Sequence, residues 1–152
     1  MKEPVFVSPA EIAASRAAAK RVKDEVYDLG LTYHIESYGC QMNEHDSEKI
    51  AGMMEEMGYA KAEDKSKADF IIFNTCCIRE HAEQRVYGNI GALKKRKDEN
   101  PQLMIGVCGC MMQQPGMGEQ ILKQYPFVDL AFGTHNLYRF AQLMLKAVQS
   151  RR

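Results

Sequence analysis

Residues 69–76 read Asp-Phe-Ile-Ile-Phe-Asn-Thr-Cys, and four consecutive apolar side chains stand in the middle of this stretch. A strand with one face in water alternates apolar and polar residues, whereas a continuous apolar run is typical of a strand that is covered on both faces, as in parallel sheets. The run gives way to Asn74 and Thr75, and Cys76 follows. We therefore predict a buried parallel strand at Asp69–Asn74, with a cysteine just past its carboxyl end.

The order of strand, turn and helix recurs on both sides of this stretch. Upstream, a strand at Tyr33–Tyr38 precedes a helix for which Asn43, with Asp46 three residues later, is the predicted N-cap. Gly58 is predicted to close that helix in a left-handed conformation. The later elements are predicted as a helix from about Arg79 to Lys97, a strand at Leu103–Val107, a short helix from Pro115, a strand at Val128–Phe132 and a last helix from Leu137. Strands that alternate with helices predict an α/β fold, with an open, mainly parallel four-stranded sheet and helices on both faces, as in flavodoxin-like and Rossmann-like proteins.

An additional helix is predicted before the first strand. Residues from about Ser8 to Leu29 are rich in Ala, Lys, Arg and Glu, with Val22, Val26 and Leu29 at helical spacing and Gly30 as a possible C-cap. We interpret residues 1–30 as an N-terminal helical extension and residues 31–152 as one domain.

Three cysteines, Cys40, Cys76 and Cys110, each follow a predicted strand. The carboxyl ends of parallel strands share one edge of the sheet, where open α/β sheets bind their ligands. Three thiolates suit an iron–sulfur cluster and leave the fourth iron open to another ligand. The alternative interpretation is that these are buried core cysteines. That alternative suits Cys77 and Cys108, and we leave open whether either can replace a lost ligand.

Two further features favour an anionic cluster at this edge. Gly39 and Gly109 precede two of the cysteines and would let the chain approach closely. Helices predicted to begin near Asn43, Arg79 and Pro115 would point backbone N–H groups toward the same edge.

Composition narrows the classes of function. The 152 residues hold 20 basic and 20 acidic side chains, and a net charge of zero argues against a dedicated nucleic-acid module. An odd number of cysteines and the lack of a long apolar run indicate a cytoplasmic protein without a membrane segment. We predict that Lys94–Lys97 is a solvated helix end far from the cysteines, and that His45, His81 and His135 are exposed or capping residues.

Several short motifs resemble the N-terminal domain of radical-SAM methylthiotransferases, over a span from about Tyr33 to the C-terminus. The motifs are Tyr38–Asn43, Asp46–Glu48, Asn74–Cys76, Ile78–Glu80, Gly109–Cys110 and Gln113. The wording of the first motif is most similar to the branch of the family that modifies tRNA, and less similar to the branch that acts on a ribosomal protein.

The resemblance implies that Cys40, Cys76 and Cys110 ligate an auxiliary [4Fe–4S] cluster that supplies sulfur for methylthiolation of N6-isopentenyl-adenosine in tRNA. In the family, S-adenosylmethionine and a second [4Fe–4S] cluster belong to a following radical-SAM barrel, on a C-x-x-x-C-x-x-C motif that this chain lacks. We therefore expect a fragment of a longer protein that is not catalytically competent alone. Its expected partners are the barrel in cis and tRNA, bound mainly through other domains.

Two other functions remain open from the residues alone. A flavodoxin-like module could bind flavin or a nucleotide at the same edge, but residues 39–43 (Gly-Cys-Gln-Met-Asn) are not a Ser/Thr-rich phosphate-binding loop. A zinc or thiol redox module is the other alternative, and the missing C-x-x-C motif argues against it.

Overall fold

A computed structural model describes residues 9–26, 29–37, 41–75, 80–109, 116–133 and 137–150, with the backbone alone at 41–44, 80–86, 117 and 138. In chain order the elements are α1 (Pro9–Val26), β1 (Thr32–Ser37), α2 (Gln41–Glu56), β2 (Ala60–Lys61), the 3-10 helix η1 (Lys65–Lys67), β3 (Phe70–Thr75), α3 (Glu80–Glu99), β4 (Met104–Gly109), α4 (Met117–Gln124), β5 (Leu130–Phe132) and α5 (Leu137–Gln149).

The strands form a single five-stranded sheet in the order β2-β1-β3-β4-β5, and every neighbouring pair is parallel. This is the strand order of flavodoxin, in which the direction of winding reverses between the first and third strands. The predicted open parallel α/β sheet is therefore confirmed, and the order places the reversal point between β1 and β3.

The predicted count of four strands is wrong by one, because β2 was not recognised. This strand is only two residues long and both are exposed, so its sequence carries no apolar run. Backbone bonds define it: Ala60 N–H donates to Leu31 O at 3.1 Å, and Ala62 N–H donates to Tyr33 O at 2.9 Å.

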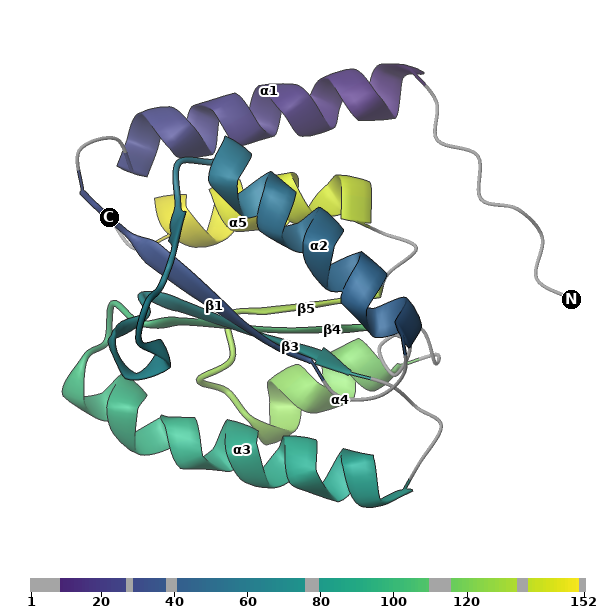
Figure 1. Cartoon of the computed structure of the whole chain (residues 1–152), viewed down its shortest axis with the longest axis vertical. Coiled ribbons are helices and arrows are strands. Elements are labelled where there is room, and N and C mark those ends of the chain that lie inside the picture. Colours follow the sequence, from purple (N-terminus) through teal and green to yellow (C-terminus); the bar gives the residue numbers. More distant parts are fainter. Residues whose placement is uncertain are drawn as a thin grey trace, which may run out of the picture.

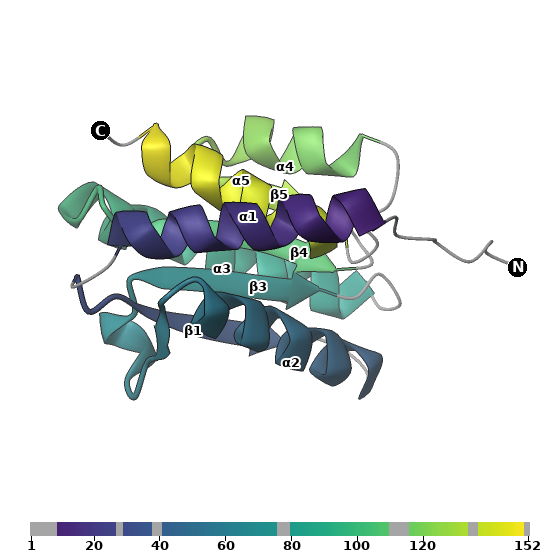
Figure 2. The same ribbon diagram turned by 90° about the horizontal axis from the view of Figure 1, so that it is seen from above.

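Helices cover both faces of the sheet, as predicted. Figure 1 shows α1, α2 and α5 on one face and α3 and α4 on the other, and Figure 2 shows the first layer from above. Each face has its own core. Phe70, Ile72 and Phe140 are buried on the first face, and Ile71 and Ile105 on the second. The alternating side chains of β3 thus serve two cores, which explains its continuous apolar run.

Helix α1 packs against α5 rather than extending into solvent (Figures 1 and 2). Val22 and Val26 are buried, as their spacing predicted. The prediction for Leu29 is wrong, because α1 ends at Val26 and Leu29 is 62% exposed. Gly30 has a φ of +63°, and its predicted role as C-cap stays a prediction because residues 27 and 28 lie outside the described part of the chain. None of the helices described is long and apolar enough to cross a bilayer.

Two other boundaries differ from the predictions. Helix α2 begins at Gln41, so Asn43 lies in its first turn and the N-cap prediction is wrong. Strand β4 continues two residues beyond the predicted Val107, to Gly109. The predicted left-handed Gly58 is confirmed by its φ of +91°.

Lys94–Lys97 lies near the C-terminus of α3. Its predicted position far from the cysteine-bearing edge agrees with the structure, but its predicted solvation does not hold for every side chain. The segment lies at the amino edge of the sheet, away from the strand ends that precede the cysteines (Figure 1). Two of its side chains are not solvated ends. Arg96 Nη2 donates to Ser66 O at 2.7 Å, and Lys97 Nζ lies 2.9 Å from Asp129 Oδ2. These cations hold neighbouring loops.

Candidate functional site at the carboxyl edge of the sheet

Three adjacent strands end together at the edge from which the predicted cysteines leave. In the β1–β3 pair Ser37 is the register partner of Asn74, and in the β3–β4 pair Thr75 is the register partner of Gly109. Cys40 stands three residues after Ser37, Cys76 directly after Thr75, and Cys110 directly after Gly109. The three cysteines, and Cys77 with them, lie outside the described residues. The structure therefore describes the edge that presents them.

Gly109 allows β4 to lie unusually close to β3. Its φ is +113°, and a Cβ at this position would lie 2.2 Å from Thr75 O and 2.7 Å from Thr75 N. Only glycine fits a positive φ with backbone at such a distance. That Gly39 and Gly109 let the chain approach a cluster stays a prediction, and Gly39 lies outside the described residues.

A row of polar side chains crosses the sheet just before the strands end. Ser37, Asn74 and Cys108 are register partners on β1, β3 and β4. Ser47 of α2 lies next to this row: its Oγ is 2.6 Å from Ser37 Oγ and accepts a bond from Asn74 Nδ2 at 2.9 Å. On β3, Thr75 Oγ1 donates to Cys108 O at 2.8 Å. Hydrogen bonds thus link all three strand ends and α2.

Sequence reasoning missed the positions of Ser47 and Asn74 in this network. Asn74 is completely buried at the end of an otherwise apolar strand. A buried amide needs hydrogen-bond partners, so its place directly after the apolar run was the available signal. Ser47 had no comparable signal, because its role depends on how α2 folds back over β1 and β3.

Cys108 is a core residue, as predicted. It is completely buried in the cluster formed with Met104, Leu130 and Phe132. Burial, and to a smaller extent the charge of Asp46, raise the pKa of the Cys108 thiol. The thiol is therefore protonated at neutral pH, and a protonated thiol is a poor metal ligand.

The helix termini at this edge favour negative charge. Helices α2, α3, α4 and α5 begin at Gln41, Glu80, Met117 and Leu137, each following a strand that ends there. Their positive dipole ends therefore lie at the edge. His45 is exposed, as predicted, and the side chains of His81 and His135 are not described. Within the described part of the chain, no three His, Cys, Asp or Glu side chains are grouped to hold a metal ion.

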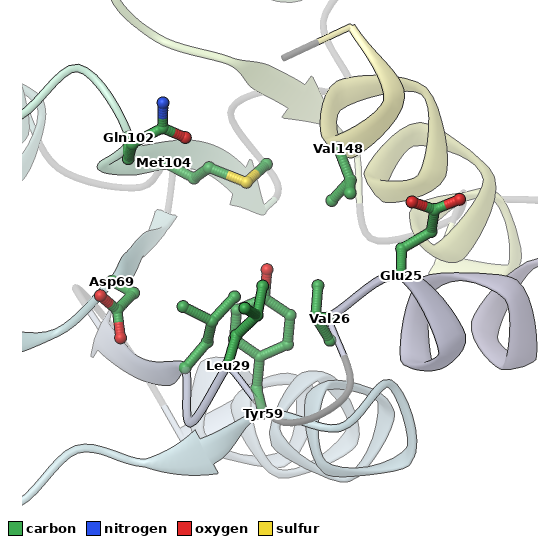
Figure 3. A pocket seen from close by; sticks show the side chains of 9 residues that line it. Glu25, Val26, Leu29, Tyr59, Asp69, Gln102, Met104 and Val148 are labelled. Atoms are coloured by element: carbon green, nitrogen blue, oxygen red, sulfur yellow. The ribbon is translucent and has the colours of Figure 1, made fainter. Parts of the chain in front are cut away.

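Two hollows lie among the described residues, one at the opposite edge of the sheet and one beside β1. The larger, about 380 Å³, opens at the amino edge of the sheet and is lined mainly by apolar side chains, among them Val26, Tyr59 and Met104 (Figure 3). The smaller, about 310 Å³, lies beside β1 and α2 and includes Ser37 and Ser47 in its wall.

Comparison with known families matches residues 32–133 to "Uncharacterized protein family UPF0004". This span covers β1 to Gly133 and includes all three predicted cysteine ligands. The chain belongs to this family. Among curated relatives of this UPF0004 chain, a protein of Clostridium tetani is 63% identical over 118 residues, which is 78% of the chain and 26% of the relative. A protein of Acetivibrio thermocellus is 48% identical over 155 residues, which is 98% of the chain and 32% of the relative.

Both relatives, and one of a Thermoanaerobacter species that is 47% identical over 150 residues, are named tRNA-2-methylthio-N(6)-dimethylallyladenosine synthase. The UPF0004 chain spans about a quarter to a third of their length. The resemblance to the N-terminal domain of the methylthiotransferases, inferred from the cysteine motifs, is confirmed.

Proposed function

We propose that this UPF0004 chain is the auxiliary-cluster domain of a tRNA methylthiotransferase, and that Cys40, Cys76 and Cys110 together bind one [4Fe–4S] cluster. One observation carries the proposal: β1, β3 and β4 are neighbours in the sheet and end in register at one edge. A cysteine follows each of these ends within three residues.

Chain connectivity supports convergence of the three thiols. Adjacent strands lie about 4.8 Å apart and consecutive Cα atoms about 3.8 Å apart, so one step beyond Thr75 and one beyond Gly109 leaves Cys76 and Cys110 within about 12 Å. Three steps beyond Ser37 give Cys40 a reach of about 11 Å toward the same point. Convergence therefore requires no rearrangement of the described sheet.

The local chemistry also fits a cluster. Gly109 removes the side chain that would block the approach of β4 to β3, and the helix N-termini favour negative charge. The buried Cys108 stays in the core and leaves the ligand role to the three edge cysteines. When bound, a [4Fe–4S] cluster on three thiolates has one iron open to an exogenous sulfur ligand.

For the whole protein we propose the reaction that the names of the relatives describe, methylthiolation of dimethylallyladenosine in tRNA. In this proposal the chain supplies sulfur, and S-adenosylmethionine with a second cluster acts in a part of the protein outside the 152 residues. We therefore expect no turnover by the isolated chain, and tRNA contacts chiefly elsewhere.

Anaerobic reconstitution with iron and sulfide tests the proposal. The wild type should gain a brown absorbance with about equal iron and sulfide, while the Cys40→Ala/Cys76→Ala/Cys110→Ala variant should gain none. Cys108→Ala is the matched control, and it should bind as the wild type does. Equal binding by the wild type and the triple variant would refute the ligand assignment.

A flavodoxin-like function is the second candidate, because the strand order places the reversal point between β1 and β3 at this same edge. Titration with FMN, followed by flavin fluorescence, tests it directly. We expect no quenching, since residues 39–43 hold no Ser/Thr-rich phosphate loop. Zinc without colour in the purified protein would instead support a zinc or thiol module.

A further inference from the structure

The polar contacts at the carboxyl edge converge on one hydroxyl, that of Ser47. Its Oγ accepts from Asn74 Nδ2 at 2.9 Å and lies 2.6 Å from Ser37 Oγ. These three residues come from α2, β3 and β1. We call the chain Ser37–Ser47–Asn74 the edge brace.

The edge brace spans the point where winding reverses, between β1 and β3. Between these two strands the chain passes through α2, β2 and η1, and α2 carries Ser47. Within the described residues, the β1–β3 ladder reaches the pair Ser37 and Asn74, and the β3–β4 ladder reaches the pair Thr75 and Gly109. The edge brace therefore lies at the last described pair of the β1–β3 ladder.

Sequence position makes the brace relevant to one cysteine in particular. Ser37 and Ser47 lie on either side of Cys40, while Asn74 stands two residues before Cys76. The β3–β4 side of the edge has a separate hydrogen bond, from Thr75 Oγ1 to Cys108 O at 2.8 Å.

We propose that Ser47 is a positioning residue, which holds the segment bearing Cys40 in register with the segment bearing Cys76. The inference rests on the proposed function for its purpose, but the positioning itself is a property of the protein without a cluster. Loss of the Ser47 hydroxyl should loosen Cys40 relative to Cys76 and leave Cys76 and Cys110 in their mutual position.

Thiol crosslinking of the cluster-free protein tests this directly. All variants carry Cys77→Ala, are reduced, and are treated anaerobically with dibromobimane, and the crosslinked pairs are assigned by mass spectrometry. Ser47→Ala should slow the Cys40–Cys76 crosslink about fivefold, the change that corresponds to the loss of one hydrogen bond, and leave the Cys76–Cys110 crosslink unchanged.

Two further variants separate positioning from general stability. Ser47→Thr keeps a hydroxyl and should restore the wild-type Cys40–Cys76 rate. Thr32→Val is the matched control at the opposite end of β1: it removes the bond from Thr32 Oγ1 to Asp69 Oδ2 at 3.3 Å and should change neither crosslink. The same set is then reconstituted, and iron release to a chelator is timed; Ser47→Ala should release iron several-fold faster than Thr32→Val.

The outcomes distinguish the two proposals. Equal slowing of both crosslinks, slowing in Thr32→Val, or no slowing in Ser47→Ala would each overturn the positioning role, whatever the wild type binds. A selective loss of the Cys40–Cys76 crosslink in a protein that binds no iron would support the brace and refute the cluster assignment.

Discussion

At the scale of single residues, the carboxyl edge depends on a glycine that has no room for any side chain. Gly109 combines a φ of +113° with a hypothetical Cβ only 2.2 Å from Thr75 O. Gly116 also has a positive φ, of +77°, but nothing lies within 4 Å of its Cβ position. Comparing substitutions of Gly109 and Gly116 therefore separates the free-energy cost of a positive φ from the cost of the steric overlap with β3.

We predict that Gly109→Ala lowers the free energy of unfolding by about 3 kcal/mol or more, because backbone strain and overlap with β3 add. Gly116→Ala carries the strain alone and should cost about 1 kcal/mol. Urea denaturation followed by circular dichroism measures both. Equal effects of the two substitutions would show that β4 does not approach β3 as described.

A second prediction concerns the ion pair at the opposite edge. Lys97 Nζ lies 2.9 Å from Asp129 Oδ2, with both side chains less than 20% exposed, and it also donates to Leu103 O. Lys97→Met leaves the half-buried carboxylate without this cation and should cost about 2 kcal/mol of unfolding free energy. Lys65→Met, which breaks the exposed contact with Glu36, should cost less than about 0.5 kcal/mol. Thermal and urea unfolding distinguish the two values, and similar costs would contradict the difference in burial.

The pH dependence of stability gives a third prediction at this scale. Partial burial acts to raise the pKa of Glu36, but hydrogen bonds from His34 and Lys65 outweigh it and lower the pKa below its ordinary value of 4.5. A carboxyl group with a lowered folded pKa stabilises the fold above its unfolded pKa, and the contribution is lost as pH falls through the folded value.

Glu36→Gln should therefore be less stable than the wild type near neutral pH, and the gap should close as pH falls from about 5 to about 3. Exposed Glu63→Gln serves as the control and should follow the wild-type curve. Urea midpoints measured across this range test the prediction, and a gap that widens toward low pH would contradict it.

At the scale of elements, the sequence could predict every segment that carries strong apolar patterning. Strand β3 shows a four-residue apolar run, and α5 shows a clear apolar face, so both were located within one or two residues. Strand β2 could not be predicted, because Ala60 and Lys61 pair by backbone bonds alone. The start of α2 was misplaced because a cap-like pair, Asn43 and Asp46, lies inside the helix rather than before it.

For the candidate site, too, only the features with a local sequence pattern could be predicted. Strand ends and Gly109 followed from local pattern, whereas Ser47 depends on the packing of α2 over the sheet, which no local pattern contains. The packing of α1 is a similar case: its apolar face was visible, but its partner α5 is more than 100 residues away in the chain.

The packing of α1 gives a prediction at this scale. Val22 lies on α1 and is completely buried in the first core, whereas Leu29 is 62% exposed. Val22→Ala should lower the free energy of unfolding by about 2 kcal/mol, and Leu29→Ala by no more than about 0.5 kcal/mol. Chemical denaturation of both variants provides the test. If Val22→Ala has no effect, α1 is a dispensable extension and not part of the core.

At the scale of the whole molecule, the two faces of the sheet form the hydrophobic cores, and the candidate site lies at the carboxyl edge. Helix layers on both faces bury the sheet, and β1, β3 and β4 end at the edge beside the reversal point (Figure 1). In the proposed function, cysteines that are distant in the sequence meet at this edge without a compact metal-binding motif. The same arrangement explains why spacing in the sequence alone left a buried-cysteine interpretation open.

Native mass spectrometry of the anaerobically reconstituted chain tests the central claim most directly, because it counts the clusters on each intact molecule. We predict the mass increment of one [4Fe–4S] cluster on the wild type and on Cys77→Ala, and its loss in each single alanine substitution of Cys40, Cys76 and Cys110. An increment that survives all three single substitutions, or one that disappears only with Cys77, would contradict the assignment of the cluster to these three strand ends.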